Sequence, residues 1–162
     1  MFKNIPWRQH FAFALACAIL YCIPVFILLT NPAFSRIWLL YLGNGLFLIA
    51  LVTHIFRFNR SVPGGATSMG MLAASVITTM MGILLSFVIS WLLIVIMVPG
   101  LFHAGVAGKT LTGAPASTIG QHTHGLIFMI LMSITAGNFA VGLFASLIFP
   151  FTLKLNQTKE EV

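Results

Sequence analysis

The chain has 162 residues, of which 59% are hydrophobic and only 6% are charged, whereas soluble domains are about 25% charged. That composition leaves too little polar surface to cover a soluble domain, so lipid must be the solvent for part of the chain. The net charge of +6 comes from scattered Lys and Arg without a basic run. This pattern is typical of the cytoplasmic face of a membrane protein, and we expect no nucleic-acid partner.

Four apolar, charge-free stretches are each long enough to cross a bilayer as a helix, which takes about 20 residues. They cover residues 11–30, 37–56, 71–98 and 126–149. The third is overlong, at roughly 42 Å, so we expect it to tilt or to project from the membrane. The sequence therefore predicts an all-α integral membrane bundle of four transmembrane helices, as one domain over residues 1–162.

Two prolines and the basic residues before the first span bear on how these spans begin, bend and end. Pro24 should kink the first helix, and Pro150 should end the fourth. The apolar run that follows Lys3 and Arg8 reaches Leu29, which is longer than the core of a cleaved signal peptide, about 7–15 residues. We therefore expect the first helix to be retained.

The basic residues predict the orientation through the positive-inside rule. One side of the membrane receives Lys3, Arg8, Arg57, Arg60, Lys154 and Lys159, and the other receives Arg36 and Lys109. This asymmetry places both termini in the cytoplasm and the 99–125 loop outside. That loop has no helical or strand period, and a long loop of this kind is either functional or disordered, or it lies on the membrane as a short helix.

Small and hydroxyl residues recur at helical spacing on one face of the third span. They are Ser75, Thr79, Gly82, Ser86 and Ser90. In lipid, small and weakly polar residues mark the contacts between helices. We interpret this stripe as a helix–helix seam, with one wall of a polar pathway as the alternative.

The fourth span has two such faces, which predicts contact with two neighbours and a central place in the bundle. One face has Ser133, Ala136, Gly137 and Ala140, and the other has Thr135, Asn138, Gly142, Ala145 and Ser146.

Asn44 and Asn138 are the two amides within the membrane, and each follows a glycine, Gly43 or Gly137. The matching dipeptides hint at a two-helix unit that is used twice. We expect the amides to form interhelical hydrogen bonds, with ligand contact as the alternative.

Chemistry-bearing residues are few. No Asp, Glu, Lys or Arg lies within a span, which argues against ion-coupled transport. Cys17 and Cys22 point roughly 140° apart on a helix, so we interpret them as packing residues. Thr67 or Ser68 should cap the third helix.

The histidines leave two further hypotheses open. His122 and His124, joined by His103, are candidate metal ligands in the outer loop, although solvated loop histidines are the plainer interpretation. A haem between His10 and His54, or between His103 and His124, is the other hypothesis. We expect no cofactor. The chain has no Gly-x-Ser-x-Gly, His-Glu-x-x-His or P-loop motif, and we expect no enzyme.

The stretch FRFNRSVPGGATSMGMLAA (56–74), the Pro99 that closes the third helix and the glycine-rich fourth helix with its Lys-bearing tail resemble a family of uncharacterised four-pass bacterial inner-membrane proteins. The outer loop, with Lys109 as its only charge, has no counterpart there. The resemblance implies a bacterial inner membrane and this topology, but no activity or site residues.

These observations favour a non-enzymatic structural or accessory membrane protein, a homo-oligomer or a subunit of a larger membrane complex. We expect the lipid bilayer as its partner. One alternative is a passive channel or small-solute transporter along the Ser75–Ser90 stripe. The other is a haem or metal redox protein that uses the histidines.

Overall fold

The computed structural model describes residues 7–62, 65–98, 113 and 125–160, with side chains up to Leu153. Its four long helical segments are each apolar enough to cross a membrane, which confirms the predicted all-α bundle of four transmembrane helices. The elements are α1 (Trp7–Thr30), a 3₁₀ turn (Phe34–Arg36), α2 (Trp38–Ser61), α3 (Ser68–Met97), α4 (Leu126–Met132), a π-helical turn (Ser133–Gly137) and α5 (Asn138–Glu160).

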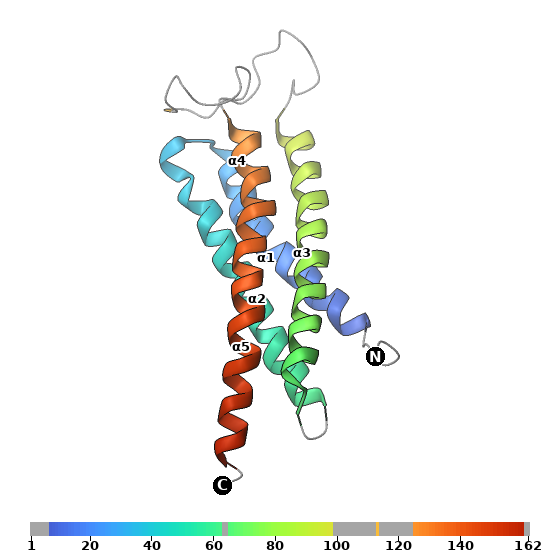
Figure 1. Ribbon diagram of the computed structural model, residues 1–162. Helices are drawn as coiled ribbons and strands as arrows, with labels where there is room; N and C mark the ends of the chain where they lie inside the picture. Colours follow the sequence, from blue (N-terminus) through green and yellow to red (C-terminus); the bar gives the residue numbers. More distant parts are fainter. Residues whose placement is uncertain (1–6, 63–64, 99–112, 114–124, 161–162) are drawn as a thin grey trace.

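Successive helices run in alternating directions, and α4, the π-helical turn and α5 together form the fourth (Figure 1). At one end of the bundle, here called the terminal end, α1 begins, α2 ends, α3 begins and α5 ends. The opposite end is called the far end. The hairpin of α1 and α2 slants across α3 and the α4–α5 helix (Figure 1), and α1 packs on both α2 and α3.

The fourth helix contacts two neighbours, α2 and α3, as predicted, but α1 is the most buried helix, so the predicted central place of the fourth helix is wrong. Half of the apolar 18-residue window of α1 is buried, against 28% of that window in Leu126–Leu153. The physical reason is a run of small residues, Ala14, Cys17 and Ala18, all 0% exposed. Small side chains let neighbouring backbones approach closely, so α2 and α3 both cover α1.

The connection between α2 and α3 is held by two side chains. The hydroxyl of Thr67 accepts a hydrogen bond from the Gly70 N–H at 3.1 Å, so Thr67 is the predicted N-cap of α3. The Asn59 side chain accepts from the Ala66 N–H at 2.9 Å. Together they set where α3 leaves the turn after α2.

The prediction that the fourth helix ends at Pro150 is wrong, because the helix continues to Glu160. Proline lacks only its own N–H, which would have bonded to the carbonyl of Ser146 one turn earlier. The other hydrogen bonds of the helix remain available, so the chain stays helical beyond the proline.

Candidate functional site

Two histidines and a threonine meet between three helices near the terminal end of the bundle. Nδ1 of His10 on α1 lies 3.1 Å from Nε2 of His54 on α2 and 3.0 Å from Oγ1 of Thr78 on α3. All three residues are at most 1% exposed. The rings of Phe13 and Phe58 pack against the pair, so this polar cluster is enclosed by aromatic side chains.

One arrangement of protons satisfies every contact of the cluster. In this arrangement the Thr78 hydroxyl donates to the Ala74 carbonyl at 2.9 Å and accepts from Nδ1–H of His10. The same N–H faces Nε2 of His54, which is then an acceptor and leaves the His54 proton on Nδ1. Nδ1 of His54 has no hydrogen-bond partner among the described residues.

The geometry of the pair does not fit a haem. When two histidines bind a haem iron from opposite faces, their coordinating nitrogens are about 4 Å apart, because each metal–nitrogen bond is about 2 Å long. The macrocycle lies between the two rings. The nitrogens of His10 and His54 are 3.1 Å apart, and their rings meet edge to face with centroids 5.0 Å apart. The space between them is therefore closed to a flat cofactor.

The stripe on α3 faces the interior of the bundle and is filled by side chains of α1 and α2. A Cβ on Gly82 would lie 3.0 Å from the Phe47 ring and 3.5 Å from Cβ of Cys17. Sγ of Cys22 lies 3.5 Å from Oγ of Ser90. Both cysteines are buried free thiols that pack in this contact. All members of the stripe are buried: Ser75, Thr79, Gly82, Ser86 and Ser90.

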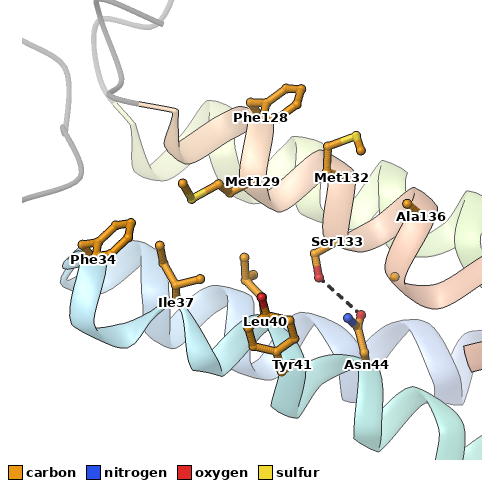
Figure 2. A pocket seen from close by; sticks show the side chains of 11 residues that line it. Phe34, Ile37, Leu40, Tyr41, Asn44, Phe128, Met129, Met132, Ser133 and Ala136 are labelled. Carbon is orange, nitrogen blue, oxygen red and sulfur yellow. Dashed lines mark hydrogen bonds between the residues drawn. The ribbon is translucent and has the colours of Figure 1, made fainter. Parts of the chain in front are cut away.

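Asn44 of α2 meets the π-helical turn of the fourth helix (Figure 2). The Ser133 hydroxyl donates to Oδ1 of Asn44 at 3.3 Å. A Cβ on Gly137 would lie 2.5 Å from Nδ2 of Asn44, so only glycine leaves room for the amide. Within the turn, the Asn138 N–H bonds to the Ser133 carbonyl five residues back. Single π-helical turns are frequent at functional sites, and no sequence pattern announced this one.

The two Gly-Asn dipeptides meet but do not repeat each other's contacts. Asn44 lies against Gly137, whereas Gly43 lies against the Tyr21 ring, 3.1 Å from its ideal Cβ position. Asn138 is 0% exposed, and neither of its amide atoms has a hydrogen-bond partner among the described residues. Of the two predicted interhelical amides, the structure therefore pairs Asn44 alone.

Several other buried hydroxyls are also unpaired within the described chain. Thr79 lies against Gly142, one turn from Asn138 on α5. An unsatisfied buried polar group costs about 1–3 kcal/mol, and such groups usually mark a bound water or a functional role. The buried hydroxyls without a partner among the described residues are those of Tyr21, Thr79, Ser86 and Ser146.

The candidate metal ligands of the outer loop, His103, His122 and His124, lie outside the described residues, and so does Lys109. A metal site there stays a prediction.

The sequence paired His10 with His54 only as haem ligands. The direct contact between the two rings, with Thr78 as its third member, was not predicted. It depends on how each helix is rotated, which the spacing of residues within one helix does not give.

No protein family, curated protein or solved structure matches the chain. The resemblance to four-pass bacterial inner-membrane proteins therefore stays a prediction.

Proposed function

We propose that the chain is a non-enzymatic structural or accessory subunit of a bacterial inner membrane, working in a homo-oligomer or a larger membrane complex. The supporting observation is that its interior is filled. The hydroxyl-bearing residues of the stripe, from Ser75 to Ser90, are at most 2% exposed. A water-filled pathway along the stripe would expose them, whereas helix packing buries them.

The outer surface of α3 supports the same proposal. Only 22% of its apolar 18-residue window is buried inside the chain, although α3 is the longest helix, with 30 residues. Most of this window is therefore available to lipid or to another chain.

The proposed orientation has the terminal end in the cytoplasm. Arg8, Arg57 and Arg60 are exposed there, whereas Arg36 is exposed at the far end, and basic residues favour the cytoplasmic side. The test uses Ser61→Cys and Ser35→Cys in a cysteine-free background. A membrane-impermeant thiol reagent added to intact cells should label the second variant alone, and the reverse pattern would invert the topology.

Oligomeric state tests the subunit proposal directly. Native mass spectrometry in a mild detergent, after extraction from the protein's own membrane, should show an oligomer or a co-purifying partner. Cross-linking of intact membranes before extraction controls for dissociation by detergent. A lone monomer in both experiments contradicts the proposal.

A passive pathway is the second candidate, because it would account for the unpaired polar atoms between α3 and α5. Its test is thiol labelling of Ser86→Cys and Ser90→Cys after both native cysteines are replaced by alanine. Ser61→Cys, at an exposed helix end, is the positive control. If a water-soluble reagent labels the control and neither stripe position, the pathway is ruled out.

A further inference from the structure

A groove of about 480 Å³ lies between α2 and the fourth helix at the far end of the bundle (Figure 2). Its walls are aromatic, aliphatic and methionine side chains, and the Ser133–Asn44 hydrogen bond closes its inner end. The lining residues are Phe34, Ile37, Leu40, Tyr41, Asn44, Phe128, Met129, Met132, Ser133, Ala136 and Gly137.

The length of the groove matches one leaflet of a bilayer. Its lining on the fourth helix runs from Phe128 to Gly137, which is about 14 Å along a helix axis. The hydrocarbon core of a bilayer is about 30 Å thick. The groove therefore extends from the membrane surface to near the midplane.

The walls of the groove select the kind of molecule that fits. Its lining is almost wholly apolar, and the lining residues Phe34, Tyr41, Phe128 and Met132 are exposed at its surface. A hydrocarbon chain from the surrounding lipid matches this chemistry.

Charge at the mouth of the groove selects the headgroup. Arg36 is exposed and stands in sequence between Phe34 and Ile37, which both line the groove. The guanidinium group binds phosphate oxygens in bidentate fashion. The exposed Trp38 and Tyr41 next to it are residues typical of the membrane–water interface. The mouth therefore lies at the depth of lipid phosphates.

We propose that this groove binds one acyl chain of an anionic phospholipid from the far-end leaflet, with the phosphate on Arg36. The chain lies between α2 and α4 and ends at the Ser133–Asn44 hydrogen bond. This site is independent of the subunit role, because a monomer would bind the lipid equally well.

The test measures lipid retention in nanodiscs made of equal parts phosphatidylglycerol and phosphatidylcholine with the same acyl chains. Native mass spectrometry should release the wild-type chain with one phosphatidylglycerol attached. Ala136→Trp fills the groove and should abolish this retention. Ala140→Trp places the same ring one turn further along the helix, on an exposed position outside the groove, and should retain the lipid.

Arg36→Gln tests the headgroup separately and lies in a surface turn, so it keeps the proposal testable even if a tryptophan variant misfolds. We expect it to bind the two lipids equally. The proposal is overturned if the wild type retains no lipid, if Ala136→Trp retains as much as the wild type, if Ala140→Trp loses the lipid too, or if Arg36→Gln still prefers phosphatidylglycerol. Loss of a co-purifying protein instead of a lipid in Ala136→Trp would assign the groove to a protein partner.

Discussion

Replacing Gly137 by alanine should destabilise the bundle by displacing the amide of Asn44. The new Cβ would lie 2.5 Å from Nδ2, well inside the 3.4 Å at which ordinary contact begins, so the amide must shift by about 0.9 Å. Overpacking of this kind costs about 1–3 kcal/mol. The bond from Ser133 is already 3.3 Å long and would be lost at a further cost of about 0.6 kcal/mol. The higher helix propensity of alanine offsets about 0.5–1 kcal/mol of this cost. We therefore expect the free energy of unfolding to fall by about 2 kcal/mol.

Gly45→Ala is the matched control. It makes the same change on α2, but a Cβ there has no atom within 4 Å, so helix propensity should leave this variant as stable as the wild type or about 1 kcal/mol more stable. The assay is reversible unfolding by SDS in mixed micelles, followed by circular dichroism.

A double-mutant cycle shows whether the cost arises from Asn44. In the Asn44→Ala background the obstructing amide is absent, so Gly137→Ala should cost less than about 0.5 kcal/mol. Equal stability of Gly137→Ala and Gly45→Ala, or the same cost of Gly137→Ala in both backgrounds, would show that the Asn44 amide does not obstruct a side chain at position 137.

Three further predictions concern other buried polar groups. Thr78→Val removes the hydroxyl bonded to His10 and should lower the free energy of unfolding by about 1–2 kcal/mol. Thr79→Val removes an unpaired hydroxyl and should leave that free energy unchanged or raise it. Equal effects of the two variants in SDS unfolding would contradict the assigned hydrogen bonds. Asn138→Leu should stabilise the bundle by about 1–3 kcal/mol if its amide is dry, and a loss of stability in the same assay would reveal a bound water or ligand. Both buried cysteines should resist maleimide in native micelles and react in SDS, as counted by mass spectrometry; rapid native labelling would show that water reaches the interior.

The hydrophobic spans were predictable because the requirement to cross a bilayer is local. Each span needs only enough consecutive apolar residues and internally paired backbone groups. The four helices, the cap at Thr67 and the small-residue stripe of α3 could therefore be recognised from each segment alone, without knowing which helix packs against it. Pro150 shows the limit of local rules. A proline weakens a helix, and its neighbours decide whether the helix ends.

Composition and hydropathy were enough to predict four membrane-spanning helices whose interior is built from uncharged residues. The three-dimensional arrangement was needed to learn that α1 is the most buried helix, that His10 meets His54, that Asn44 is paired while Asn138 is not within the described residues, and that a groove opens between α2 and the fourth helix. These features depend on how each helix is rotated, tilted and shifted against its neighbours. That choice is made by close packing between residues far apart in the chain, and periodicity within one helix does not contain it.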